Sequence, residues 1–270
     1  MRLQNKVVLV TAATRGIGLA CVEACAKEGA IVYMAARSEE RARKAADPLV
    51  SAGLRVRHVY NDADVPESFA SMVEDVVSLE GRIDVLVNNF GGSDPSEDRD
   101  LQHTKPEVFL DTVTRNLRSV FLGSQAAVRY MAQGNGGSIV NISSVGGIVP
   151  DIAQIAYGTS KAAINYLTKL IAVQEAKHNI RCNAVLPGMT ATDAVAERLS
   201  EDFKKSFLRH VPLGRMATPQ EIADAVVYFA GDGSACTTGQ ILTVSGGFGT
   251  ATPLYGDFSL GNSSRSAAQK

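Results

Sequence analysis

The sequence of 270 residues contains no tryptophan, only four cysteines and no large excess of charge of either sign. Four cysteines in a chain of this length do not make the disulfide framework of a small secreted domain. Lysines and arginines number 27 against 28 aspartates and glutamates, so the basic excess typical of a nucleic-acid-binding domain is missing. No apolar run approaches the ~18 residues that cross a bilayer. We therefore expect a cytoplasmic protein with neither a membrane nor a nucleic-acid partner.

The hydrophobic pattern that is present alternates between short and long segments. Short β-branched runs predict strands over residues 6–12, 30–36, 54–61, 83–88, 138–143, 180–186 and 240–244. The stretches between them predict helices over residues 16–29, 39–52, 66–80, 106–133, 154–177 and 218–230. This alternation favours right-handed strand–helix–strand units with a parallel sheet covered on both faces. We predict an α/β fold: one domain over residues 1–258 with a Rossmann-type, doubly wound parallel sheet of about seven strands, and a flexible tail over residues 259–270.

The first predicted strand runs directly into a glycine-containing turn, with the sequence Thr11-Ala12-Ala13-Thr14-Arg15-Gly16-Ile17-Gly18. At such a position glycines let the backbone approach a pyrophosphate, and the N-terminus of the following helix binds the anion. Ala12 stands where a G-x-G-x-x-G motif has its first glycine, so we expect this residue to adopt a negative φ. The turn predicts a dinucleotide-binding site.

The residues after the second predicted strand indicate which dinucleotide is bound. NAD-specific sites usually carry an acidic side chain here, whereas this strand is followed by Arg37 and Ser38. Arg37 and Arg15 are placed to converge on a 2′-phosphate, with which guanidinium groups form strong hydrogen bonds. The acidic residues 39 and 40 suit instead the first turn of a helix that Ser38 caps. We therefore predict a preference for NADP(H).

Tyr157 and Lys161 stand four residues apart in a predicted helix and therefore share one of its faces. A phenol with its ordinary pKa of about 10 is a poor base at neutral pH, but an adjacent ammonium favours the phenolate and lowers that pKa. Such a tyrosine can exchange a proton with an alcohol or a ketone. Ser144 ends a predicted strand, and its hydroxyl can hold the reacting oxygen. The three residues together predict a dehydrogenase site.

These motifs together resemble the short-chain dehydrogenase/reductase family from Leu3 to about Phe248. The segment Asn88-Asn89-Phe90-Gly91 is similar to the Asn-Asn-Ala-Gly element of that family, with Phe90 in place of alanine. Four residues match the catalytic positions of the family: Asn116, Ser144, Tyr157 and Lys161. The resemblance implies that the cofactor contacts Thr11, Thr14, Arg15, Gly16, Ile17, Gly18, Arg37, Ser38, Asp62, Ala63, Asn89, Gly91, Tyr157, Lys161, Pro187, Gly188, Thr190 and Thr192.

The resemblance also implies a reaction, which is hydride transfer between a secondary alcohol carbon and C4 of the nicotinamide. In this mechanism Tyr157 is the general acid/base and Ser144 orients the substrate oxygen. Lys161 lowers the pKa of the tyrosine and binds the nicotinamide ribose, while Asn116 holds a water that links the lysine to solvent. Thr190 replaces the isoleucine or valine of the family, but that contact is made by the main chain.

Several further stretches resemble bacterial bile-acid hydroxysteroid dehydrogenases, and the 7α type most of all. They are residues 87–92, 144–152, 181–188, 207–213 and 252–255. Four apolar residues are expected to form a wall against a steroid face: Val145, Ile148, Val149 and Met189. Three basic residues are candidates to meet the acidic side chain of a bile acid: Arg198, Arg209 and His210. Because 7α and 12α hydroxyls lie on the same steroid face, we expect 7α oxidation and keep 12α as the alternative.

Two other functions remain open on the sequence alone. A 3-oxoacyl carrier-protein reductase shares every catalytic motif, although no clear basic patch for a carrier protein is visible. A catalytically silent, NADP(H)-sensing regulatory protein would share the fold, but the intact Ser144, Tyr157 and Lys161 count against it.

Two cysteines and two long helices complete the set of expectations. Cys21 and Cys25 stand one helical turn apart, but no third ligand is near them, so we expect core packing and no metal site. The predicted helices over residues 106–133 and 154–177 are rich in apolar residues. In the family that the chain resembles, such helices build a tetramer, which implies a homotetramer.

Overall fold

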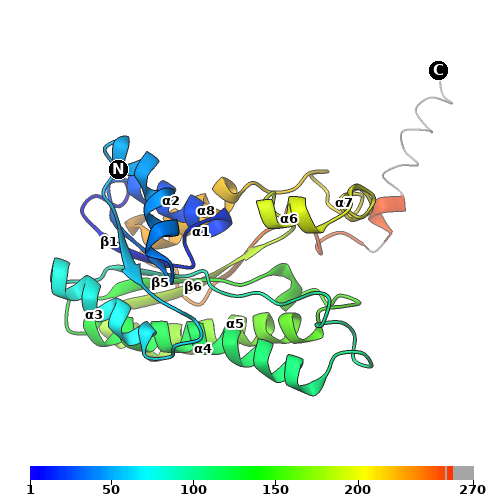
Figure 1. Cartoon of the computed structure of the whole chain (residues 1–270), viewed down its shortest axis with the longest axis horizontal. Helices are drawn as coiled ribbons and strands as arrows, with labels where there is room; N and C mark the ends of the chain where they lie inside the picture. The colour runs from blue at the N-terminus through cyan, green and yellow to red at the C-terminus, as the bar shows by residue number, and fades with distance from the viewer. Residues whose placement is uncertain (253, 258–270) are drawn as a thin grey trace.

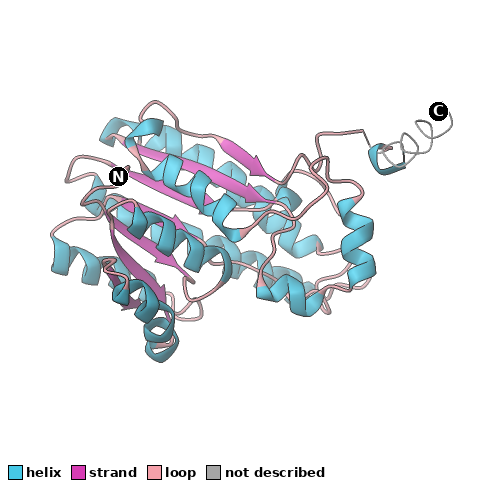
Figure 2. Ribbon diagram, turned by 90° about the horizontal axis from the view of Figure 1, so that it is seen from above, coloured by secondary structure: helices cyan, strands magenta, loops and turns pink. Residues whose placement is uncertain are grey.

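Seven parallel strands form one sheet in a computed structural model, which describes residues 1–252 and 254–257, apart from the side chains of residues 194, 196 and 198. The strands are β1 (Val7–Thr11), β2 (Ile31–Ala36), β3 (Val56–Tyr60), β4 (Val85–Asn88), β5 (Gly137–Ile142), β6 (Ile180–Pro187) and β7 (Ile241–Val244). They lie in the order β3-β2-β1-β4-β5-β6-β7. Figure 2 shows the strands, in magenta, side by side in the sheet. The predicted strands and the doubly wound sheet are thus confirmed, and the predicted tail over residues 259–270 lies outside the described residues.

Helices cover both faces of this sheet (Figure 1). On one face lie α1 (Gly16–Lys27), α2 (Glu39–Ser51) and α8 (Pro219–Ala230), and on the other α3 (Ser68–Glu80), α4 (Pro106–Met131) and α5 (Ile155–Gln174). Alternate residues of each strand enter different cores because their side chains point to opposite faces. In β1, Val8 and Val10 join the core on the side of α1 and α8, whereas Val7 and Leu9 join the core on the side of α3 and α4.

The strand order reverses between β1 and β4, and this reversal locates the crevice in which open α/β sheets bind ligands. β1 pairs with β2 on one side and with β4 on the other. The carboxyl ends of β1 and β4 therefore lie side by side, at Thr11 and Asn88. Single-turn 3-10 helices also occur at Val145–Gly147, Ala176–His178 and Asp232–Ser234.

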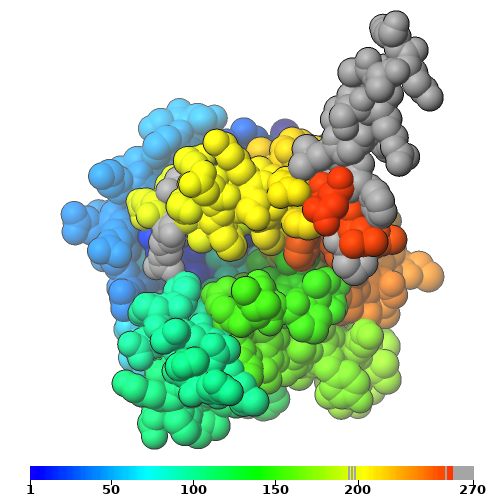
Figure 3. Space-filling model, turned by 90° about the vertical axis from the view of Figure 1, so that its right-hand side faces the viewer, coloured from blue at the N-terminus to red at the C-terminus, as the bar shows by residue number. Residues whose placement is uncertain are grey.

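The segment over residues 189–213 contains two helices that the sequence analysis did not predict, α6 (Asp193–Arg198) and α7 (Glu201–Leu208). Each begins at a hydroxyl cap: Thr192 accepts from the Val195 N–H at 3.4 Å and Ser200 from the Phe203 N–H at 3.2 Å. The two helices lie beyond the carboxyl ends of the strands, away from the layers that cover the sheet (Figure 1). From that end of the molecule, the yellow segment that contains them faces the green residues around 150 (Figure 3).

Cys21 and Cys25 are buried in the core between α1 and α8, as predicted. Burial raises the pKa of the Cys21 thiol well above its ordinary value and that of Cys25 to about 12, so both remain thiols at neutral pH. No helix of the described residues is both long and apolar enough to cross a membrane.

Candidate active site

The turn after β1 is tied to the end of β4 by a set of short hydrogen bonds. The buried Thr11 hydroxyl accepts from the backbone N–H groups of Asn89 at 2.9 Å and Phe90 at 3.2 Å. The Asn89 side chain donates back to the carbonyl oxygens of Thr11 and Ala12, both at 3.1 Å. The two motifs predicted to bind the cofactor are therefore one rigid unit at the switch point of the sheet.

The N-terminus of α1 is built to receive an anion. Among the described residues, no side chain caps this helix, and its first turn holds no acidic residue. A Cβ on Gly18 would lie 2.6 Å from the Ala12 carbonyl oxygen and 2.6 Å from the Asn89 side-chain nitrogen, so only glycine fits. Gly16 has a φ of +54°, which favours glycine for a different reason. The helix dipole and its unpaired N–H groups suit a phosphate at this point.

Ala12 departs from the expectation of a negative φ, because the structure gives it a φ of +51°. The expectation was wrong since it considered only the local chain. The hydrogen bonds from Asn89 hold the carbonyl groups of Thr11 and Ala12 in a fixed direction, which imposes the left-handed conformation. For a residue with a Cβ this conformation costs about 1–2 kcal/mol.

An Ala12→Gly variant is expected to raise the free energy of unfolding by about 0.5–1 kcal/mol. The substitution relieves the left-handed Cβ, and the greater freedom of glycine in the unfolded chain offsets part of the gain. Ala13→Gly is the control, because Ala13 is a buried neighbour without a positive φ and its replacement should destabilise. Urea unfolding compares the variants, and a less stable Ala12→Gly protein would refute the strain.

The residues predicted to meet the adenosine half of the cofactor gather at the ends of β2 and β3, which are neighbours in the sheet. Arg37 is exposed, and among the described residues neither it nor Arg15 forms an ion pair. Ser38 caps α2 by accepting from the Arg41 N–H at 3.3 Å, as predicted. Asp62 follows β3, where its carboxylate accepts from the Asp64 N–H at 3.0 Å, and Ala63 is buried beside it.

Tyr157 and Ser144 meet across the gap between α5 and the end of β5. Ser144 acts on the Tyr157 hydroxyl as a hydrogen-bond partner that lowers its pKa, and the Ser144 Oγ accepts from the Gly146 N–H at 3.1 Å. Burial raises the pKa of Tyr157, and the hydrogen bond to Ser144 opposes this rise. The sequence analysis predicted a pKa lowered by Lys161, so the direction is reversed, because desolvation of the phenol dominates.

Lys161 lies almost completely buried, one turn along α5 from Tyr157. Its Nζ donates to the Ile142 carbonyl oxygen at 3.0 Å and lies 5.5 Å from the centroid of the Tyr157 ring. Burial lowers the pKa of Lys161 to about 8. A Cβ on Gly91 would lie 2.9 Å from this Nζ, so the glycine lets the end of β4 approach the lysine.

Asn116 comes from α4 and is also buried. Its side-chain oxygen accepts from the Gly92 N–H, and its side-chain nitrogen donates to the Gly92 carbonyl oxygen, both at 3.1 Å. The same nitrogen donates to the Ser160 hydroxyl at 2.9 Å. The side chain therefore joins the loop after β4 to α5, next to the lysine.

The segment after β6 closes the crevice from the other side. Thr190 is buried, and its hydroxyl donates to the Gly188 carbonyl oxygen at 3.0 Å. A Cβ on Gly16 would lie 3.5 Å from Cγ2 of Thr192. The start of α6 therefore lies against the first turn of α1, and the residues from Pro187 to Thr192 border the same crevice as the turn after β1.

The residues expected to contact a steroid are only partly brought together. Val145 is buried and Ile148 is exposed, while a Cβ on Gly249 would lie 2.5 Å from Cγ2 of Val149, which places the C-terminal segment on that side chain. Phe248 stacks on Phe207 of α7, with ring centroids 4.6 Å apart.

The basic candidates for the acidic side chain of the substrate differ in their availability. Arg209 is paired with Asp257 at 3.2 Å, and His210 lies against Gly256. The Arg198 side chain lies outside the described part of the chain. To bind the acidic side chain of a bile acid, Arg209 would have to give up its ion pair with Asp257. The sequence analysis did not predict this ion pair.

The sequence analysis missed one buried residue of the site, Asp98, in the loop between β4 and α4. Its carboxylate accepts from the Ala156 and Tyr157 N–H groups, each at 2.9 Å. The sequence carries no signal for this contact, because the partners are 58 and 59 residues apart.

Three comparisons with known proteins agree with this geometry. A family model described as enoyl-(acyl carrier protein) reductase matches residues 11–249. The chain is 49% identical to a 7alpha-hydroxysteroid dehydrogenase of Clostridium sardiniense, over 95% of this chain and 98% of that protein. It is 46% identical to a 7alpha-hydroxysteroid dehydrogenase of Paraclostridium sordellii, over 95% and 97%. A crystal structure of a short-chain type dehydrogenase/reductase from Mycobacterium marinum superposes with a TM-score of 0.86 at 33% identity, covering 92% of this chain and 97% of that one.

Proposed function

The chain belongs to the short-chain dehydrogenase/reductase family, and we propose that it is an NADP(H)-dependent hydroxysteroid dehydrogenase that oxidises the 7α-hydroxyl of a bile acid reversibly. One observation carries the proposal: a complete Ser144, Tyr157 and Lys161 cluster lies at the switch-point crevice of a chain that is 49% identical to a 7alpha-hydroxysteroid dehydrogenase. The 12α-hydroxyl is the alternative position.

The residues at the crevice fit a dinucleotide. The uncapped N-terminus of α1 and the space left by Gly18 suit a pyrophosphate. Lys161 would hold the nicotinamide ribose, and the backbone at Gly188 and Thr190 would hold the carboxamide. When bound, the nicotinamide supplies the hydride chemistry, while the protein supplies position and electrostatics.

The side chains divide the proton chemistry among them. Ser144 holds the substrate oxygen, since its hydroxyl already meets that of Tyr157. Tyr157 takes the proton from the alcohol or returns it to the ketone. Lys161 stabilises the tyrosinate when its own ammonium is formed. Asn116, fixed by Gly92 and Ser160, would place the water that carries the proton onward to solvent.

Cofactor choice is tested by an Arg37→Asp variant. We expect its affinity for NADPH to fall by about 10–100-fold, because a guanidinium–phosphate contact of about 1.5–3 kcal/mol is replaced by a repulsion. Its affinity for NADH should hold or improve. Lys44→Asp makes the same change of charge on the exposed face of α2 and is the control. Titration of nicotinamide fluorescence gives the dissociation constants of both cofactors for the wild type and the two variants. An unchanged affinity of Arg37→Asp for NADPH would overturn the proposed preference.

The substrate is tested by following nicotinamide absorbance with four bile acids. Chenodeoxycholate offers 3α and 7α hydroxyls, deoxycholate 3α and 12α, cholate all three, and lithocholate only 3α. Turnover of cholate and chenodeoxycholate alone is expected for a 7α enzyme. Turnover of cholate and deoxycholate alone would replace it with the 12α enzyme.

A second candidate is a 3-oxoacyl carrier-protein reductase, because relatives of that printed name are 35% and 40% identical to this chain. Turnover of a 3-oxoacyl thioester, with no bile acid oxidised, would support it. Binding of NADPH without turnover of any carbonyl compound would instead support a regulatory sensor.

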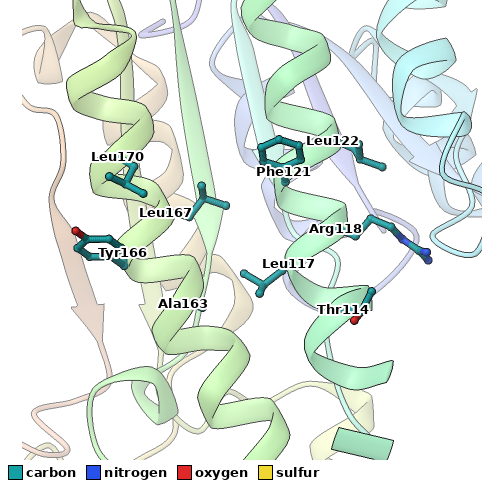
Figure 4. Close-up of a pocket in the computed structure, with 9 residues that line it drawn as sticks. All are labelled: Thr114, Leu117, Arg118, Phe121, Leu122, Ala163, Tyr166, Leu167 and Leu170. Atoms are coloured by element: carbon teal, nitrogen blue, oxygen red, sulfur yellow. The ribbon is translucent and has the colours of Figure 1, made fainter. Parts of the chain in front are cut away.

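The outer faces of α4 and α5 support the proposed homotetramer. A groove of about 600 Å³ runs between the two helices (Figure 4), lined by Thr114, Leu117, Arg118, Phe121, Leu122, Ala163, Tyr166, Leu167 and Leu170. Phe121 and Tyr166 are exposed there, and apolar faces of this kind mark contacts between proteins. Light scattering should give four times the chain mass of 28.6 kDa. We also propose that the enzyme is cytoplasmic. A monomer would refute the assembly.

A further inference from the structure

Asp98 is a carboxylate buried without a countercharge. It is 0% exposed, and it forms no ion pair within the described residues. Each of its two oxygens accepts a hydrogen bond from a backbone N–H at the start of α5. Ala156 donates to Oδ1 and Tyr157 donates to Oδ2, each at 2.9 Å. Burying a charge is costly unless it is hydrogen-bonded. Within the described part of the chain, the hydrogen bonds to this carboxylate come from the first turn of the helix that carries Tyr157.

Helix α5 does not cap itself. Its N-cap residue, Gln154, has a φ of +58° and no side-chain cap hydrogen bond, and the first turn contains no acidic residue. The Ile155 N–H donates to the Arg99 carbonyl oxygen at 3.1 Å, and the Gln154 amide donates to the Ser93 hydroxyl at 3.2 Å. The loop between β4 and α4 therefore binds three consecutive N–H groups at the start of α5, and the Asp98 carboxylate takes two of them.

We propose that Asp98 is a positioning residue for catalysis, fixing the first turn of α5 so that the Tyr157 hydroxyl meets Ser144. The inference rests on the proposed function, since it gives Asp98 a kinetic role through Tyr157. A carboxylate at a helix N-terminus forms charge-assisted hydrogen bonds and interacts favourably with the dipole. Because the buried Asp98 carboxylate binds the backbone N–H of Tyr157, its role concerns turnover and not ligand binding.

An Asp98→Asn variant keeps the shape of the side chain but exchanges one acceptor oxygen for a donor that faces a helix N–H. We expect kcat to fall by about 10–100-fold, as a small misplacement of an acid/base group does. The KM for the bile acid and the dissociation constant of NADPH should stay within about threefold. Amide hydrogen exchange should become faster in the peptide over residues 154–160 and not in α1.

Asp100→Asn is the matched control, because it makes the same change on the same loop. Its carboxylate accepts from the Gln102 and His103 N–H groups, both at 3.0 Å, and does not touch α5. We expect its kcat to equal that of the wild type. Thr104→Val serves if Asp98→Asn does not fold: the Thr104 hydroxyl accepts from the Arg99 N–H at 2.9 Å, so its loss should lower kcat by a smaller factor.

The exchange measurement separates this inference from the proposed function. A wild type that oxidises no bile acid contradicts the proposed function, whereas unchanged exchange over residues 154–160 in Asp98→Asn contradicts the positioning role. That role is also overturned if Asp98→Asn has the kcat of the wild type. If Asp98→Asn does not fold, a wild-type kcat in Thr104→Val overturns the role instead. A fall in NADPH affinity as large as the fall in kcat overturns it as well.

Discussion

A Tyr157→Phe variant is expected to lose roughly 10³-fold in kcat, which is the contribution typical of a general acid/base. The phenylalanine ring keeps the contacts of the tyrosine ring but has no proton to exchange with the substrate oxygen. The Ser144 hydroxyl stays in place and can still hold the substrate oxygen, so the loss reports the proton exchange by Tyr157. Steady-state oxidation of cholate with NADP⁺ measures the loss.

Tyr166→Phe removes the same hydroxyl from the same helix and is the control. Tyr166 is 65% exposed and lines the groove between α4 and α5, so its replacement should leave kcat unchanged. The dissociation constant of NADPH should be similar in both variants and the wild type. Near-native turnover by Tyr157→Phe would remove the acid/base role from this residue.

A Lys161→Met variant is expected to be inactive and yet more stable than the wild type at pH 7. The ammonium of Lys161 is buried, and the structure provides it with one carbonyl acceptor, at Ile142. Burial lowers the pKa of Lys161 from 10.5 to about 8, and each unit corresponds to about 1.4 kcal/mol. After subtraction of the lost hydrogen bond, removal of the charge should raise the free energy of unfolding by about 2 kcal/mol.

The change of the free energy of unfolding with pH is a second, independent test of the buried ammonium. Between about pH 8 and 10.5 the unfolded chain still binds the proton that folded Lys161 has lost. The contribution of this lysine to the free energy of unfolding therefore rises with pH across that window, and it is unfavourable below pH 8. Lys161→Met should lack this rise.

The control for the lysine is Lys169→Met, on the exposed side of the same helix. It should change neither turnover nor the pH dependence of stability. Urea unfolding at pH 7 and pH 9.5 compares the three proteins. A Lys161→Met protein that is less stable at pH 7 would show that the buried ammonium is better compensated than these contacts indicate.

Much of the fold could be predicted because its signals are local. The run Val7-Val8-Leu9-Val10 predicts a strand because a short, continuous apolar run is typical of a strand covered on both faces of a sheet. All four residues are buried in β1. Tyr157 and Lys161 are four residues apart, and this spacing places two side chains on the same face of any helix. Thr192 and Ser200 are residue types preferred at a helix N-cap, so the starts of α6 and α7 also have a local signal in the sequence.

Other features could not be predicted because tertiary contacts decide them. The positive φ of Ala12 follows from Asn89, which reaches the turn from a different strand. The role of the Asp98 carboxylate could not be predicted because it depends on the contact between the loop after β4 and the start of α5. The direction of the pKa shift of Tyr157 depends on how deeply the phenol is buried, and spacing along a helix does not contain that information.

The central claim is that hydride moves between carbon 7 of a bile acid and the nicotinamide while Tyr157 takes the proton. The most direct test supplies cholate that carries deuterium at carbon 7, with NADP⁺, and determines the mass of the reduced nicotinamide. The claim predicts that the reduced nicotinamide gains the deuterium and that oxidation is slower than with unlabelled cholate. Reduction of NADP⁺ with the deuterium left in the steroid, or no reduction at all, would contradict it.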